Sequence, residues 1–206
     1  AYDPGYQVTF ALMLTSAIIT CTLTTRLKDH AKMSAQAAFR TKILFDTNQL
    51  LQRAKSEEEI LSQTASQLMK LLNRSLIVYP EQNGDLGSEQ LFSVDGETAQ
   101  NIFSAPEERD AANWTFANKK RSGAGTDSYP DAKGLYLALR TGGGVFGVIG
   151  IDLSEKPLDA FENSVLLSIL GEGALAIENR RNALEKEQAA LQARNEELRA
   201  NLLRTI

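Results

Sequence analysis

Residues 134–153 read GLYLALRTGGGVFGVIGIDL, and this stretch decides the fold. It contains two apolar runs, Leu135 to Arg140 and Val145 to Leu153, which are separated by Thr141-Gly-Gly-Gly144. Short apolar runs joined by a glycine-rich connection are typical of a tight β-hairpin. We therefore expect an antiparallel sheet built around these residues.

Two further strands are predicted upstream of this hairpin. The first is Ser75 to Tyr79, closed by Pro80 and the turn residues Asn83-Gly-Asp85. A weaker strand is expected at Glu89 to Val94, before a turn at Asp95-Gly96. A glycine loop from Arg121 to Asp127 precedes the hairpin.

Helical patterns surround the strands. One long helix is expected over 31–55, and Ser56 with Glu59 forms an S-x-x-E capping box that starts a second. Its apolar face is Leu61, Ala65, Leu68 and Leu72. A further helix is expected at Glu107 to Lys120, and a last helical pattern runs from Asp159 to Ile206 without a stop signal. The order of elements predicts an α+β domain with an antiparallel sheet, whose two outer helices can cover one face.

The N-terminal residues include a candidate membrane span. Val8 to Leu23 carries no charge, and about 18 uncharged residues up to Thr25 would reach roughly 27 Å as a helix. Arg26 and Lys28 follow the run, which by the positive-inside rule places the next domain in the cytoplasm. The alternative is a soluble or buried helix rich in threonine.

Composition excludes several functions. The 206 residues carry a net charge of −4, one cysteine (Cys21) and one histidine (His30). The only basic cluster, Lys119-Lys-Arg121, is too short for a nucleic-acid footprint, so nucleic acid is disfavoured as a partner. One cysteine rules out a multi-cysteine metal site, and a histidine-rich metal site or a Ser-His-Asp triad would need His30. Gly123-x-Gly125 lacks the third glycine of a dinucleotide fingerprint, so we interpret it as a turn. We expect no catalytic residue, no metal and no cofactor in this chain.

Several short motifs, in this order, resemble a known family. The hairpin and its helices resemble a GAF domain over about Leu44 to Arg181, and the details resemble the GAF domain of the KdpD family of potassium-responsive sensor histidine kinases. The motifs are Trp114, Phe116 and Asn118, then Gly123-Ala-Gly-Thr-Asp127, then Gly134-Leu-Tyr136; the flanks are Asp3-Pro-Gly-Tyr6 and Leu198 to Arg204.

The resemblance implies a part of a larger signalling enzyme. It implies a membrane-bound homodimer that autophosphorylates a histidine with ATP and Mg²⁺, passes the phosphoryl group to a response regulator and controls potassium uptake. The phosphoacceptor would follow Ile206. The expected parts are a membrane segment and basic junction (1–30), a linker helix (31–55), a GAF-like sensor domain (56–175) and a coiled-coil signalling helix (176–206). Another membrane-anchored enzyme, such as a cyclic-dinucleotide cyclase, and a ligand-free dimerisation scaffold remain as alternatives.

The resemblance also places a ligand pocket between the sheet and the section that contains the loop. It would bring together Trp114, Phe116, Thr126, Asp127 and Tyr136 around an unidentified small molecule. Trp114 and Phe116 are two residues apart, so on a helix they point in different directions and cannot both line one wall. Packing in the core remains the alternative for each of the five. No histidine or cysteine lies inside the domain, which excludes axial haem ligation by histidine and thioether attachment of a bilin.

The last helix carries the predicted relay. Leu184, Leu191 and Leu198 recur every seven residues and would occupy d positions of a parallel dimer. The a positions would be Arg181, Gln188, Asn195 and Leu202, and such a half-polar contact line suits a marginally stable switch. Ile177 would lie at its start. Gly171 and Gly173 indicate either close helix packing or a kink.

Overall fold

The computed structural model describes residues 4–94 and 96–204. Some side chains fall outside that description: 1–12, 19, 23, 25, 27, 29–32, 95–98 and 200–206. The chain consists of two compact units, residues 1–43 and 44–206. The four predicted parts of the chain and the boundaries between them stay predictions.

The described residues of the first unit, 4–43, lie within helix α1 (Pro4–Arg53). Hydroxyl groups of its threonines donate to carbonyl groups four residues earlier, as from Thr20 to Ser16 and from Thr24 to Thr20. Helix α1 also contains the predicted linker helix, 31–55, as far as Arg53. Met13–Thr22 is a short apolar stretch of α1. By length and composition, one helix among the described residues could cross a membrane, Ala160–Arg199, although 39% of its most apolar window is buried inside the protein.

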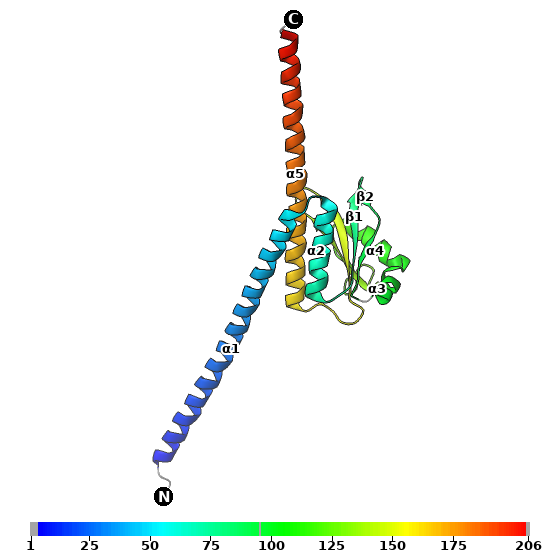
Figure 1. Ribbon diagram of the computed structural model, residues 1–206. Helices are drawn as coiled ribbons and strands as arrows, with labels where there is room; N and C mark the ends of the chain where they lie inside the picture. The colour runs from blue at the N-terminus through cyan, green and yellow to red at the C-terminus, as the bar shows by residue number, and fades with distance from the viewer. Residues whose placement is uncertain (1–3, 95, 205–206) are drawn as a thin grey trace. The chain divides into compact units, whose positions relative to one another are not determined.

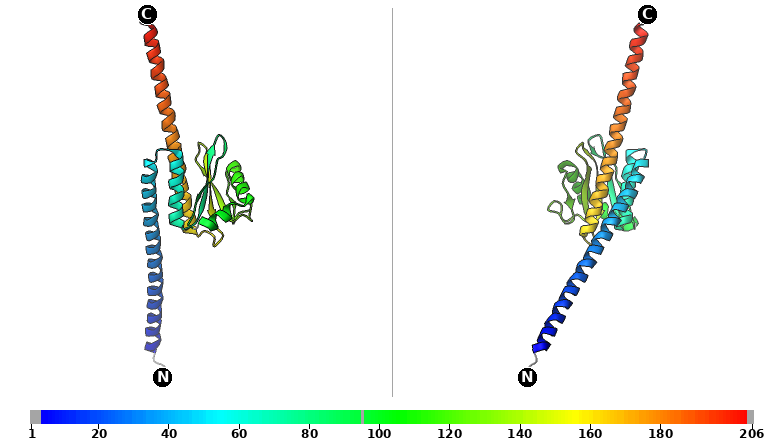
Figure 2. Two further views of the ribbon diagram at one scale, coloured as in Figure 1. Left: turned by 45° about the vertical axis from the view of Figure 1, so that its right-hand side comes forward. Right: turned by 90° about the vertical axis from the view of Figure 1, so that its left-hand side faces the viewer.

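The second unit is an antiparallel sheet between helices. Its strands are β1 (Leu76–Gln82), β2 (Asp85–Leu86), β3 (Gln90–Phe92), β4 (Ser122–Gly123), β5 (Gly134–Arg140) and β6 (Val145–Asp152). The spatial order is β2-β1-β6-β5-β4, with β3 also paired to β1. Helices α2 (Glu57–Leu72) and α5 (Ala160–Arg204) cover one face, and α3 (Gly96–Phe103) and α4 (Pro106–Asn118) lie on the other (Figures 1 and 2). The α+β prediction is confirmed.

Helix α2 begins at the predicted cap. The hydroxyl of Ser56 accepts a hydrogen bond from the backbone N–H of Glu59 at 3.1 Å. The carboxylate of Glu59 accepts from the N–H of Lys55 at 2.6 Å, one residue before the donor that the capping box predicts. The expected apolar face, from Leu61 to Leu72, is buried together with Ile60 and Thr64.

Three details of the predicted elements are wrong: a strand end, a turn and a helix end. Strand β1 continues through Pro80, which is the last residue paired with β6 and lies opposite Gly147. A proline lacks a donor but keeps its carbonyl, and Pro80 accepts from the N–H of Gly87 at 2.7 Å. Gly96 starts helix α3 instead of closing a turn. Helix α4 ends at Asn118 because Lys119 is left-handed, with φ of 57°.

Helix α5 packs closely against α2. A Cβ added at Gly173 would lie 2.7 Å from Oγ1 of Thr64, so this glycine permits the close packing that was one of its two predicted roles. A Cβ added at Gly171 would meet no atom within 4 Å. Val165, Leu166, Ile169, Leu170, Ala174 and Ile177 of α5 are buried. The apolar part of α5 is therefore the core helix of the domain.

Candidate functional site

Helix α4 carries a buried carboxylate on its side that faces the sheet. Pro106 starts α4, and Glu108 follows in its first turn. The Glu108 side chain points inward, and the residue is 2% exposed. A charged side chain at such a position needs hydrogen-bond donors, since an unpaired buried charge is very costly.

Three donors from one segment meet the carboxylate of Glu108. The backbone N–H of Lys133 donates to Oε1 at 2.6 Å, and that of Gly134 donates to Oε2 at 3.1 Å. The hydroxyl of Tyr136 donates to Oε2 at 2.7 Å. Position 134 requires glycine for this approach, because an added Cβ would lie 2.9 Å from Oε2 of Glu108. We call Glu108 and these three residues the Glu108 cluster.

Two tyrosines extend this polar site into the core. Tyr136 and Tyr79 are both buried, in a cluster that includes Ile77 and Val148. Burial, followed by the nearby charge of Glu108, raises the pKa of Tyr136 far above its usual value. Burial and then the charge of Glu89 raise the pKa of Tyr79 to about 12. Both phenols are therefore protonated at neutral pH.

Arg109 closes the outer side of this region. Its guanidinium lies over the Tyr79 ring, 4.7 Å from the ring centroid. It donates to the carbonyl groups of Leu86 and Gly87, and its other terminal nitrogen lies 3.7 Å from Glu89. Arg109 thus connects α4 to the end of β2 and to the residue that follows it.

The five predicted pocket residues lie at different depths. Tyr136 is fully buried, and Phe116 packs against the same core cluster from its half-buried position. Trp114 is half-buried on α4, and Asp127 is exposed. Oγ1 of Thr126 lies 2.8 Å from the carbonyl oxygens of Gly123 and Ser128, so it stabilises its own loop.

A hollow of about 290 Å³ lies beside this loop. Of the five predicted residues, Thr126 alone contributes to its lining, which is otherwise made by residues such as Arg121, Leu135 and Leu153. Ligand contact by the five residues stays a prediction. Within the described part of the chain, no three His, Cys, Asp or Glu side chains group as metal ligands.

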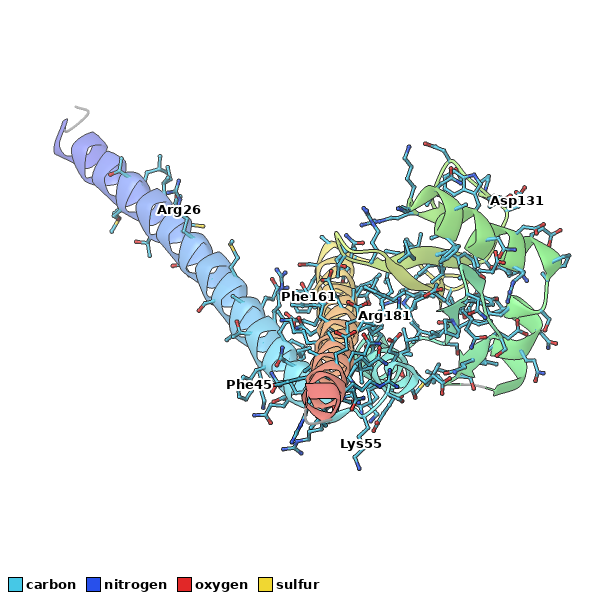
Figure 3. The ribbon with its side chains drawn as sticks, turned by 90° about the horizontal axis from the view of Figure 1, so that it is seen from above. Arg26, Phe45, Lys55, Asp131, Phe161 and Arg181 are labelled. Carbon is cyan, nitrogen blue, oxygen red and sulfur yellow. The ribbon has the colours of Figure 1, made fainter. Side chains whose placement is uncertain are left out.

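A second polar cluster lies where α5 leaves the domain. Arg181 donates to Glu57 of α2, with Nε and Nη2 each within 3.0 Å of a carboxylate oxygen, and Nη2 donates to Glu81 of β1 at 3.0 Å. The guanidinium lies 5.0 Å from the centroid of the Phe146 ring. Figure 3 labels Arg181 on α5. We call Arg181, Glu57 and Glu81 the exit clasp. Arg181 therefore faces its own domain, although the heptad pattern predicts it at a dimer contact.

Two groups of the exit clasp have shifted pKa values, and hydrogen bonds are the largest cause of each shift. The backbone N–H of Gly84 holds the pKa of Glu81 below its usual value, and Arg181 lowers it further against the opposing effect of burial. Hydrogen bonding to Glu57 raises the pKa of Arg181. Sequence reasoning missed both Glu108 and the exit clasp, because each depends on contacts between residues far apart in the chain.

The exit clasp predicts a pH-dependent effect of Arg181→Met. A carboxyl group whose pKa is lower in the folded state stabilises the fold above its unfolded pKa, and this contribution disappears as the pH falls through the folded pKa. Because the cluster is partly exposed, we expect Arg181→Met to cost about 0.5–1 kcal/mol at pH 7 and less at pH 3. Urea unfolding at both pH values measures the difference.

Arg180→Met is the matched control. Arg180 donates to the backbone carbonyl of Lys55 at 2.9 Å, which does not titrate. Its effect on the free energy of unfolding should be similar at the two pH values. An effect of Arg181→Met that is equally large at pH 3 and pH 7 would contradict the charge interaction.

Two curated proteins match nearly the whole chain. The chain is 32% identical over 206 residues to the sensor protein KdpD of Clostridium acetobutylicum, covering 100% of this chain and 23% of that protein. It is 26% identical over 204 residues to the sensor protein KdpD of Escherichia coli, covering 98% of this chain and 22% of that protein. The chain thus spans less than a quarter of these relatives. No family model matches it.

Solved structures show the same fold. The GAF domain of the potassium sensor histidine kinase KdpD from Escherichia coli aligns with a TM-score of 0.53 and 22% identity, over 73% of this chain and 99% of that one. The GAF domain of a putative sensor histidine kinase from Pseudomonas syringae pv. tomato aligns with a TM-score of 0.52 and 18% identity, over 77% and 97%. The predicted GAF fold is confirmed.

Proposed function

We propose that this chain, which is the GAF-domain segment of a sensor protein of the KdpD family, relays a signal to a downstream kinase through helix α5. The single observation that carries the proposal is the double role of this helix. It supplies buried core residues up to Ile177, and the same helix continues to Arg204, with exposed side chains from Asn182 to Arg199. A shift of the helix within the core would therefore move its extension.

The extension has the features of a dimer helix. Leu184, Leu191 and Leu198 are 39%, 56% and 55% exposed, at a spacing of seven residues. A second copy of this helix, aligned in parallel, would bury them. Since Arg181 faces its own domain, the dimer contact would start at Leu184. The side chain of Leu202 lies outside the described residues, so its part in the contact stays a prediction.

Disulfide cross-linking tests the parallel dimer. In a Cys21→Ser background, Leu191→Cys should form a covalent dimer on mild oxidation, because d positions of a parallel pair bring their Cβ atoms close together. Ala193→Cys is the control, two residues away on the outer side of the helix. Leu191→Glu should also weaken dimerisation at least tenfold, or about 1.4 kcal/mol, in analytical ultracentrifugation. Equal cross-linking at the two sites would contradict the model of a parallel pair.

Further parts of the proposal concern the parent protein. We place the domain in the cytoplasm, beside a membrane anchor formed by the apolar N-terminal run. Support comes from the threonine hydroxyls of α1, which bond within their own helix and so lower the cost of apolar surroundings. Autophosphorylation with ATP and Mg²⁺, transfer to a response regulator and control of potassium uptake belong to the same proposal.

Among the alternatives, the kinase is favoured over a cyclic-dinucleotide cyclase. Both curated relatives carry the name sensor protein KdpD, and each aligns with almost all of this chain. A ligand-free scaffold is favoured by a different observation, since Glu108 already occupies hydrogen-bond donors beside the sheet. A native mass spectrum of the chain would separate a ligand-binding GAF domain from a ligand-free scaffold, because a retained ligand adds mass to the dimer.

A further inference from the structure

We propose that the backbone amides of Lys133 and Gly134 and the hydroxyl of Tyr136 form a carboxylate-binding site, which the protein fills with its own Glu108 and which a small free carboxylate occupies when that side chain is removed. The site is a property of the domain itself. It does not depend on the relay through α5, and its test does not involve dimerisation.

The donors match the chemistry of a carboxylate. An ionised carboxylate only accepts hydrogen bonds, and its two oxygens can accept several. Here three donors reach those oxygens at 2.6, 3.1 and 2.7 Å. All three come from the short segment that enters β5, so the donor set is held in place without Glu108. The absent side chain of Gly134 leaves room for the carboxylate.

Packing alone does not require a carboxylate at this position. Replacing buried charged groups by apolar side chains of similar volume is often neutral or stabilising. Tyr136, whose hydroxyl reaches the carboxylate, belongs to an apolar core cluster with Ala111, Ala112 and Val148, so the surroundings of the site are largely apolar. Among the described residues, the hydrogen-bond partners of the Glu108 carboxylate are neutral and directional, and include no Lys or Arg side chain. A small-molecule site likewise binds a carboxylate through a few neutral donors at fixed positions.

The tether explains why Glu108 occupies the site. A side chain attached to α4 has an effective concentration in the millimolar range or above, so a free carboxylate must compete with it. Removing the side chain beyond Cβ removes this competitor. The atoms that Glu108→Ala deletes, one methylene and one carboxylate, correspond closely to acetate. Acetate is therefore the probe of matching size and charge.

The experiment is thermal unfolding of the Glu108→Ala variant of the 206-residue chain. Trp114 is the only tryptophan and lies on α4, so its fluorescence reports on the helix that carries position 108. We expect a lower Tm than in the unsubstituted chain, and a saturable rise of roughly 3–6 °C when sodium acetate is about ten times its Kd. Sodium chloride at equal ionic strength and acetamide at equal concentration should not reproduce this rise.

Three controls make the result specific. Glu108→Gln keeps the site filled, so acetate should raise its Tm no more than that of the unsubstituted chain. Glu107→Ala changes the exposed neighbour and should show no acetate effect. Adding Tyr136→Phe to Glu108→Ala removes one donor and should weaken the Kd for acetate about threefold to tenfold.

The outcomes divide clearly. A saturable, acetate-specific rise in Tm that weakens with Tyr136→Phe supports the site. A rise that sodium chloride or acetamide matches, or that appears equally in Glu108→Gln, overturns it. If Glu108→Ala is unfolded in buffer, recovery of its circular dichroism spectrum by acetate supports the site, and failure to recover overturns it.

Discussion

The free energy of unfolding of this chain is expected to fall by about 2–5 kcal/mol when Ile177 is replaced by alanine. Ile177 is 0% exposed, on the last buried turn of α5. The substitution removes apolar contacts and leaves a cavity that the surrounding helices and sheet cannot fill completely. Urea unfolding followed by the fluorescence of Trp114 measures the loss. Ile177→Val should cost only about 0.5–1.5 kcal/mol.

Leu184→Ala is the matched control, seven residues further along the same helix. Its side chain is 39% exposed, so at low protein concentration the substitution should change the free energy of unfolding by less than about 0.5 kcal/mol. At high concentration its effect should grow, because dimerisation stabilises the folded state by mass action. Equal losses for the two variants at low concentration would place both residues in the domain core and remove Leu184 from the dimer contact.

This contrast locates the transition from domain to output helix. Ile177 is the last buried side chain of α5 among the described residues, and Leu184 is the first exposed leucine of the heptad pattern after it. Arg181 lies between them and holds the helix to α2 and β1 through the exit clasp. A signal that changes the position of α5 must therefore act on these ion pairs. This makes Arg181 a positioning residue for the proposed relay.

Local sequence signals predicted those parts of the fold whose contacts are close in sequence. The β5–β6 hairpin needs only two apolar runs and a glycine-rich connection, and the start of α2 needs only Ser56 and Glu59. Asp95-Gly96 predicts a turn from its local sequence, so helix α3 is not expected there. The spacing of the buried Ala99, Ile102 and Phe103 is helical and is the signal that could have found it. A proline after an apolar run predicts the end of a strand. Pro80 nevertheless pairs with Gly147, which lies far along the chain and gives no local signal.

The polar clusters could not be predicted from one sequence. Glu108 stands in a run of charged residues, from Glu107 to Asp110, that is typical of a solvated helix surface. Only the approach of β5 to α4 makes it a buried carboxylate with three donors. Arg181 fits the heptad pattern equally well as a dimer residue, and only Glu57 and Glu81 decide its direction. Both cases depend on tertiary contacts that carry no local signal.

Gly150→Ala is expected to destabilise the domain by about 1–3 kcal/mol through overpacking at the Tyr136 ring. Gly150 on β6 lies opposite Tyr136 on β5 and Ile77 on β1. A Cβ added there would collide with the ring of Tyr136 and would lie 2.7 Å from Cγ2 of Ile77. The ring cannot easily move away, because it is fully buried and its hydroxyl is bonded to Glu108. Urea unfolding measures the loss.

Gly142→Ala supplies the control, because a Cβ at that position in the β5–β6 connection meets no atom within 4 Å. Its effect should stay within about 0.5 kcal/mol. The cause is tested by a double-mutant cycle with Tyr136→Ala, in which the obstructing ring is gone. Gly150→Ala should then cost at least about 0.5 kcal/mol less than it does beside the tyrosine. An unchanged cost would mean that the strain arises elsewhere, and that the position of Tyr136, and with it the geometry of the Glu108 cluster, does not depend on the glycine opposite.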